Sequence, residues 1–246
     1  MEYQEHGFQN HEIVHNAIDI SQFRDIFRVK KMVLIENFCK PEFAELLYQY
    51  FDDLPREKWY VSTYPESVQH IRPKHTLNVA SNAAFIRHFR SVADAEFAKD
   101  AYAFRFKRTR YPNNLPEPGP ELLLYQYLNS RVFLDVLEEV IGTQLESMNG
   151  SFASCYESGD FLARHNDANN GVVGFVLYLS KNWQADWGGE IEFMNRDTLA
   201  PHSSLLPGFN KLLIFSINEL RELQHEVKMI SNKATGKRLA YSGWFR

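Results

Sequence analysis

The feature that most constrains the fold is a change in sequence texture near residue 144. From there to residue 246 the chain is a succession of short apolar and aromatic runs, separated by glycine, asparagine, aspartate and serine. Runs of this length bounded by turn residues are typical of β-strands. We expect strands near residues 145–156, 161–165, 172–179, 189–194, 211–216, 226–230 and 238–245. Short antiparallel strands that close on themselves form a jelly roll.

The preceding half has a more helical pattern. Apolar residues recur at helical spacing, and short apolar runs predict two further strands. The expected helices cover residues 41–51, 85–97 and 124–141, and the expected strands cover residues 31–38 and 104–110. Gly142 follows the last helix at the position where helices commonly end in a left-handed glycine. Residues 55–80 are irregular, with scattered prolines and aromatic residues, and the role of residues 59–110 stays open.

These elements predict the fold class. An apolar helix stripe and an apolar sheet face must bury each other, so the helices should cover the outside of one sheet. The chain has 246 residues, 44% of them hydrophobic, which suits a single domain with a substantial core. We therefore predict an α+β protein: a double-stranded β-helix (jelly-roll, cupin-like) core with N-terminal supporting helices.

Charge and cysteine content narrow the partners and the compartment. The net charge of −4 argues against binding to nucleic acid or to an anionic membrane. The basic and aromatic residues of 104–110 would also suit a nucleic-acid site, but a half-buried strand is the preferred interpretation. No apolar run approaches the ~20 residues of a membrane-spanning helix. Cys39 and Cys155 are far apart, which favours two free thiols and a cytoplasmic protein.

One histidine–aspartate pair stands out in the strand-rich half. His165 and Asp167 are two positions apart, so on an extended strand their side chains point to the same face. His225 follows the apolar run 211–216 and could join them from another strand. Two imidazoles and one carboxylate on one face of an octahedral ion are the arrangement of non-haem Fe(II) oxygenases. We take His165, Asp167 and His225 as candidate metal ligands.

The order of motifs around this pair resembles a known family. The segments that carry the resemblance are residues 154–167, 176–183, 187–191, 209–215, 225–227 and 237–245. In this order they resemble the prolyl 4-hydroxylase-like branch of the 2-oxoglutarate and Fe(II)-dependent dioxygenase superfamily. The resemblance covers about the last hundred residues and says less about the substrate.

The resemblance implies a set of cofactors and the residues that bind them. Fe²⁺ would be held by His165, Asp167 and His225, with 2-oxoglutarate and O₂ as co-substrates and ascorbate as a supporting reductant. Arg238 would form a bidentate ion pair with the distal carboxylate of 2-oxoglutarate, a task that suits a planar guanidinium. Tyr178 would donate to the same carboxylate, and Tyr156 would reach toward the metal-chelating end. The presence of Asp167 favours hydroxylation over halogenation.

The expected activity is hydroxylation of an unactivated C–H bond, with conversion of 2-oxoglutarate to succinate and CO₂. A prolyl residue of a protein is the leading substrate, and a free amino acid or related small metabolite is the alternative. A non-catalytic cupin-like module that binds metal or 2-oxoglutarate is the third interpretation. We expect one domain over residues 1–246, with 1–143 as helical support and pocket rim and 144–246 as the catalytic jelly roll. The oligomeric state stays open.

Overall fold

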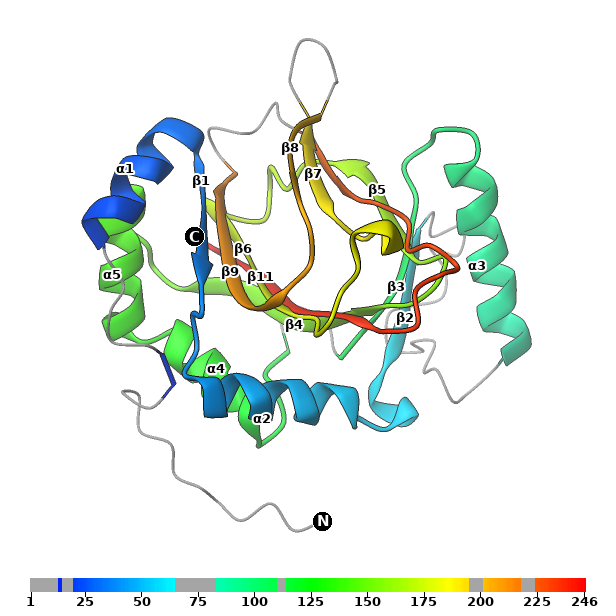
Figure 1. The fold of residues 1–246 in the computed structure, drawn as a ribbon, viewed down its shortest axis with the longest axis horizontal. Coiled ribbons are helices and arrows are strands. Elements are labelled where there is room, and N and C mark those ends of the chain that lie inside the picture. The colour runs from blue at the N-terminus through cyan, green and yellow to red at the C-terminus, as the bar shows by residue number, and fades with distance from the viewer. Residues whose placement is uncertain (1–12, 15–19, 65–82, 110–113, 195–200, 218–223) are drawn as a thin grey trace.

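The protein is built on one strongly curled antiparallel sheet, seen edge-on in Figure 1. The computed structural model describes residues 13–14, 20–64, 83–109, 114–194, 201–217 and 224–246. Its strands are β1 (Met32–Glu36), β2 (Tyr60–Tyr64), β3 (Phe104–Arg108), β4 (Met148–Tyr156), β5 (Phe161–His165), β6 (Val173–Leu179), β7 (Ile191–Met194), β8 (Pro201–Leu205), β9 (Phe209–Ser216), β10 (His225–Val227) and β11 (Arg238–Phe245). The curled sheet forms a half-barrel, which confirms the predicted double-stranded β-helix core.

The strand order explains how the sheet curls. Neighbours follow the path β1-β9-β6-β11-β4-β3-β5-β10-β7-β8, and β2 pairs with β3 off this path. β11 pairs along most of its length with β4 on one side and with β6 on the other. The strands β5, β10 and β7 continue beyond β3 and bend over the inner face of the half-barrel. Side chains from both ends of this path therefore face one interior.

Helices cover the outside of the sheet, as the apolar stripes predict. They are α1 (Ile20–Lys30), α2 (Pro41–Asp52), α3 (Ala83–Phe97), α4 (Pro120–Leu128) and α5 (Arg131–Ile141), with the 3₁₀ turns η2 (Arg56–Lys58) and η4 (Ala185–Trp187). α2 contacts β11 and β6, and α3 contacts β2 and β3. In Figure 1, α1 and α5 lie to the left of the sheet, α4 and α2 lie below it, and α3 lies to the right. No helix in the described ranges combines the length and apolarity that crossing a bilayer requires.

Local sequence explains how α2 forms and packs on the sheet. Pro41 occupies the first turn of α2, where its missing N–H is not needed. Phe43, Leu47 and Phe51 recur at helical spacing and are almost fully buried. The Phe51 ring stacks near Tyr241 of β11, with ring centroids 6.5 Å apart. α2 is thus held by an aromatic and aliphatic stripe, as the sequence pattern predicted.

The structure corrects several element predictions. The single helix expected over 124–141 is two helices, because Ser130 leaves the helical conformation and caps α5 by accepting a hydrogen bond from the Phe133 amide at 3.4 Å. The irregular stretch 55–80 contains β2, whose residues pair with β3. β8 was not predicted. The strands near 145 and 226 were also misplaced by a few residues, beginning at Met148 and at His225.

Two local predictions are confirmed. Gly142 ends α5 with φ +74°, the left-handed conformation expected of a glycine at this position. Cys39 and Cys155 are both buried free thiols.

Three strands from the first half of the chain (β1, β2 and β3) belong to the same sheet as the later ones, so this half contributes more than helical support. The division of the domain at residues 143 and 144 stays a prediction.

A buried carboxylate ties α3 to the sheet. Asp160, whose side chain is fully buried, lies 2.5 Å from Arg90 of α3 and 3.7 Å from Arg105 of β3. It also accepts a hydrogen bond from the Glu157 amide at 2.9 Å. Arg105 is held in addition by Asp94 at 3.0 Å. Burial raises the pKa of Asp160, and the two arginines oppose that effect.

We expect Asp160→Ala to destabilise the fold by about 3 kcal/mol, because two arginines lose their shared buried partner. This is the lower end of the range for breaking a buried pair, since Arg90 is 30% exposed. Urea unfolding would measure the loss. Asp135→Ala, which removes an exposed pair with Arg131 on α5, is the control and should leave the midpoint unchanged. Equal losses in the two variants would contradict the assigned role of Asp160.

Candidate metal centre

The two candidate histidines meet because their strands pair. His165 ends β5 and His225 begins β10, and the two residues are direct cross-strand partners in the antiparallel ladder. Side chains of directly opposite residues lie on the same face of a sheet. The ring centroids are 4.2 Å apart. Pairing across sixty residues of chain therefore brings the two imidazoles to one point.

The third candidate completes a compact cluster. Asp167 lies two residues beyond His165, just after β5 ends. Its carboxylate oxygens are 3.7 Å from His165 Nε2 and 3.5 Å from His225 Nε2. One ligand atom from each of the three residues lies within 4.8 Å of the others, as a single ion requires. The structure thus brings together all three residues predicted from the sequence.

The hydrogen bonds and protonation of the cluster suit metal binding. His165 Nδ1 lies 3.0 Å from the Ala163 carbonyl oxygen. A carbonyl oxygen can only accept a hydrogen bond, so this contact favours the tautomer with the proton on Nδ1. The lone pair of Nε2 is then available to a metal. Asn170 Nδ2 donates to Asp167 Oδ1 at 3.1 Å and orients that carboxylate. Burial, assisted by His165 and opposed by Asp167, lowers the pKa of His225 to about 3. Neutral imidazole is the form that coordinates metals.

An apolar wall surrounds His225. The rings of Phe193 and Phe215 have centroids 5.5 and 5.4 Å from the His225 ring. Gly174 makes room for Phe215, since a Cβ at this glycine would come within 2.3 Å of the Phe215 ring. These contacts fix the imidazole and keep water away from its face. A larger residue at position 174 would displace Phe215 and, through it, His225.

The cluster opens into a cavity of about 90 Å³ that also contains Arg238. Arg238 is 2% exposed and begins β11, directly opposite Tyr156 of β4. Its Nε donates to the Gly189 carbonyl oxygen at 2.7 Å. Gly188 and Gly189 have φ of +71° and +76°, a bend that disfavours other residues and presents this carbonyl. Within the described ranges, Arg238 has no carboxylate partner.

The two candidate tyrosines pack against this arginine. The guanidinium carbon lies 4.9 Å from the Tyr156 ring centroid and 5.4 Å from that of Tyr178. Tyr156 lines the cavity, whereas Tyr178 is fully buried and does not. Burial raises the pKa of Tyr178 to about 12, although nearby Arg238 lowers it. The Tyr178 hydroxyl has no hydrogen-bond partner of acceptable geometry among the described residues.

These observations test whether the site fits a metal and an organic anion. Two imidazoles and a carboxylate within reach of one another suit Fe(II). A buried guanidinium without a counter-ion and a buried hydroxyl without a partner are both unfavourable unless a ligand satisfies them. An anionic ligand in the cavity would satisfy Arg238. The residues present therefore fit Fe(II) together with a small carboxylate.

An exposed aromatic patch lies beside the cluster. Tyr64 of β2, Phe104 of β3 and Tyr102 just before β3 pack together, with ring centroids 4.9 to 5.9 Å apart. Tyr64 and Tyr102 are 36% and 41% exposed. The Tyr102 ring centroid is 6.0 Å from that of His165. We call Tyr64, Tyr102 and Phe104 the aromatic rim.

Sequence reasoning placed the pocket rim in residues 1–143 but left the role of residues 59–110 open. It therefore did not single out Tyr64, Tyr102 and Phe104 as a group. Asn170 was also missed, although an asparagine three residues after Asp167 in a turn is placed to hydrogen-bond it. Trp244 also lines the cavity. Arg164, which precedes the ligand His165, lies 3.9 Å from Glu226.

Comparison with known proteins shows which class of protein shares the curled sheet and the His–Asp–His cluster. Residues 151–246 match the model of the 2OG-Fe(II) oxygenase superfamily. The fold resembles a prolyl-4-hydroxylase from Pseudomonas putida (TM-score 0.57, 16% identity, 96% of this chain and 98% of that one). It also resembles a prolyl hydroxylase from Trichoplax adhaerens solved with a hypoxia inducible factor peptide fragment (TM-score 0.59, 18% identity, 92% and 88% covered).

One curated protein is similar to this chain in sequence. The chain is 31% identical over 147 residues to the mouse (Mus musculus) prolyl 3-hydroxylase OGFOD1. That alignment covers 58% of this chain and 26% of the relative, so the chain spans about a quarter of that protein's length. Residues 151–246, which contain the His–Asp–His cluster and Arg238, are the part of the chain that matches the 2OG-Fe(II) oxygenase superfamily, and the chain is similar in sequence to a prolyl 3-hydroxylase.

Proposed function

We propose that this protein is an Fe(II)- and 2-oxoglutarate-dependent dioxygenase that hydroxylates a prolyl residue of a protein substrate. The proposal rests on one cavity, which is lined by His165, Asp167, His225 and the buried Arg238. No carboxylate among the residues that the structure describes pairs with this arginine. A structural metal site would need the cluster alone. The superfamily match and the prolyl hydroxylase relatives support the same activity.

In this mechanism His165, Asp167 and His225 hold Fe(II) through Nε2, a carboxylate oxygen and Nε2. Arg238 binds the distal carboxylate of 2-oxoglutarate, Tyr178 donates its hydroxyl to the same group, and Tyr156 flanks the co-substrate. When bound, Fe(II), 2-oxoglutarate and O₂ supply the oxidation that inserts one oxygen atom into a C–H bond and yields succinate and CO₂. Phe193 and Phe215 exclude water from the His225 side.

The aromatic rim supports a prolyl substrate over a free amino acid. Exposed aromatic rings are the surfaces on which proline-containing peptides dock, since the pyrrolidine ring packs flat against them. The rim is partly exposed and adjoins His165, so a polypeptide laid across it could extend a side chain toward the metal. We place this activity in the cytoplasm, in keeping with the buried free thiols of Cys39 and Cys155.

The activity can be tested with the purified chain, Fe(II), ascorbate and 2-oxoglutarate. We expect succinate to form, and proline-containing peptides to increase its rate and gain one oxygen atom by mass spectrometry. Turnover stimulated only by free amino acids would favour the small-metabolite alternative. Absence of succinate with every candidate would favour a non-catalytic binding module.

We expect Tyr64→Ala to raise KM for a peptide substrate about tenfold, because an exposed aromatic anchor contributes about 1.4 kcal/mol or more to binding. The value of kcat should change little, since Tyr64 touches none of the three candidate ligands. Steady-state kinetics with a proline-containing peptide would measure both. Tyr60→Ala is a matched control on the same face of β2, about 13 Å along the strand. An equal rise of KM in the control would remove the rim from substrate recognition.

A further inference from the structure

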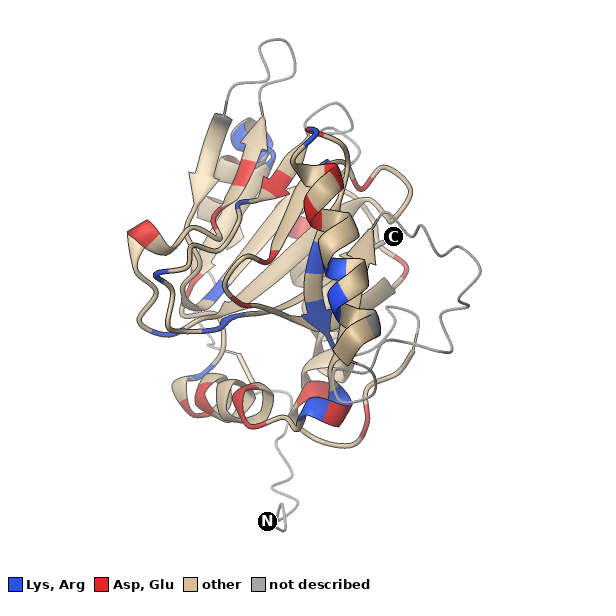
Figure 2. Cartoon of the chain, turned by 90° about the vertical axis from the view of Figure 1, so that its right-hand side faces the viewer, with Lys and Arg blue, Asp and Glu red and all other residues tan. Residues whose placement is uncertain are grey.

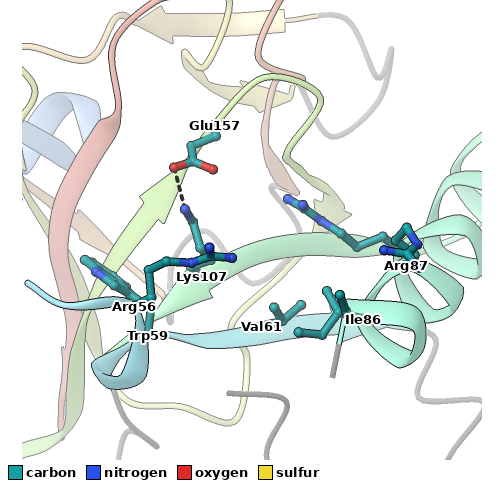
Figure 3. A pocket seen from close by; sticks show the side chains of 9 residues that line it. Arg56, Trp59, Val61, Ile86, Arg87, Lys107 and Glu157 are labelled. Atoms are coloured by element: carbon teal, nitrogen blue, oxygen red, sulfur yellow. Dashed lines mark ion pairs between the residues drawn. The ribbon is translucent and has the colours of Figure 1, made fainter. Parts of the chain in front are cut away.

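A second cavity lies on the face of the sheet that points away from the cluster. Its volume is about 380 Å³, and it lies between α3, η2 and the paired strands β2 and β3 (Figure 3). Neighbouring residues of a strand point to opposite faces. Phe106 accordingly lines the metal-site cavity while Lys107 lines the second one. We call this second cavity the rear pocket, and the thickness of the sheet separates it from the proposed active site.

The rear pocket carries an excess of positive charge. Four basic residues line it (Arg56, Arg87, Arg90 and Lys107), with Glu157 as the acidic one. Lys107 is neutralised by Glu157 at 2.5 Å, and Arg90 by Asp160 at 2.5 Å. Arg56 and Arg87 form no ion pair with any residue that the structure describes. Figure 2 shows basic segments gathered on α3 and the strand beneath it, in a chain whose net charge is −4.

The unpaired donors converge from two walls. Arg56 extends from η2 toward Lys107, and Arg87 lies on the opposite wall, on α3 (Figure 3). Arg90 Nε is buried and has no hydrogen-bond partner among the described residues. Guanidinium groups have donors only, and their planar fork matches carboxylate and phosphate oxygens. The guanidinium groups of the pocket thus have N–H donors that could bind the oxygen atoms of an anion.

The remaining lining is apolar. Trp59 and Ile86 are 6% and 8% exposed, and Val61 lies between them on β2. The volume falls within the range of sites for small molecules. A bare inorganic anion would leave this apolar surface uncovered. We propose that the rear pocket binds a small organic anion, in which a phosphate or carboxylate group is carried on an aromatic or similarly apolar body.

The proposal is tested by titrating the full chain with phenyl phosphate, benzoate and inorganic phosphate, using calorimetry and the fluorescence of Trp59. We expect saturable binding of at least one aromatic anion, tighter than that of inorganic phosphate, because its ring covers the apolar lining. The phosphate and carboxylate probes distinguish the two possible head groups. Trp59→Phe should remove the fluorescence change while calorimetric binding remains.

The double variant Arg56→Ala/Arg87→Ala should weaken binding about tenfold or more, the loss expected for one charge-assisted contact. Both arginines are exposed, so the variant should fold. The control Arg24→Ala/Arg28→Ala removes the same charge from α1 and should leave the affinity unchanged. Arg238→Met should also leave it unchanged, because that residue belongs to the other cavity. No saturable binding of any probe, equal affinity in the Arg56/Arg87 variant, or loss of binding only in Arg238→Met would overturn the proposal.

Discussion

Replacing His225 by alanine is expected to abolish metal-dependent turnover and to weaken Fe(II) binding by more than about 100-fold. Residues that only orient metal ligands already contribute up to about that factor, so removal of a ligand should exceed it. The structure gives the reason for choosing His225. It is 6% exposed, and among the described residues His165 is the one other histidine of the cluster.

Calorimetry under anaerobic conditions would measure the binding of Fe(II) or Co(II). Succinate formation is the second readout. His202→Ala is the matched control, because His202 is an exposed histidine of β8 that takes no part in the cluster. It should bind metal as the unaltered protein does. If His225→Ala retained its metal, the cluster would not be the metal centre, and the proposed function would fail with it.

Replacing Arg238 by methionine is expected to raise KM for 2-oxoglutarate about 100-fold. Removing one partner of a buried, hydrogen-bonded charge pair typically costs about 3 kcal/mol, and 1.4 kcal/mol corresponds to a factor of ten. The same variant should be more stable than the unaltered protein when no 2-oxoglutarate is present, by about 1 kcal/mol. Methionine would replace a buried charge that has no carboxylate partner in the described ranges, and such replacements are often stabilising.

Thermal unfolding with and without 2-oxoglutarate measures both parts of this prediction. The unaltered protein should gain stability from the co-substrate, and Arg238→Met should gain almost none. Lys211→Met removes a sheet cation that is paired with Glu36 at 3.1 Å, and it should leave the effect of 2-oxoglutarate intact. An Arg238→Met variant that was destabilised without ligand and still bound 2-oxoglutarate normally would show that Arg238 has only a structural role.

The limits of sequence reasoning are clearest in the first half of the chain. The apolar stripe of α2 was predictable because a helix places residues three and four apart on one side, which is a property of the local chain. β2 was not, because its residues 60–64 have no strong alternation and become a strand by pairing with β3. The break between α4 and α5 was also missed, since Ser130 acts as a cap only where the chain turns.

The candidate site shows the same division. His165 and Asp167 could be assigned to one face from their spacing alone, and the motif order pointed to Arg238 and His225. A pocket rim was expected in the first half of the chain, but the residues of the aromatic rim and the rear pocket could not be predicted. Each is made of side chains from segments that carry no shared motif, and each depends on how β2, β3 and α3 pack. The roles of Tyr156 and Tyr178 stay predictions, and the variants Arg238→Met and His225→Ala do not test them.

By itself the sequence determined the strand-rich half, the supporting helices and the motif order typical of the family. It also determined that His165 and Asp167, two positions apart, share a face. These are properties of short segments, in which the periodicity of side chains decides which face each residue occupies. Only the tertiary structure decided that His225 lies opposite His165, that Arg238 is buried with no carboxylate partner in the described part of the chain, and that Arg56 and Arg87 share a pocket. Which strands pair and which helices pack together depends on contacts between distant segments, and the pattern of one short segment does not specify its partner.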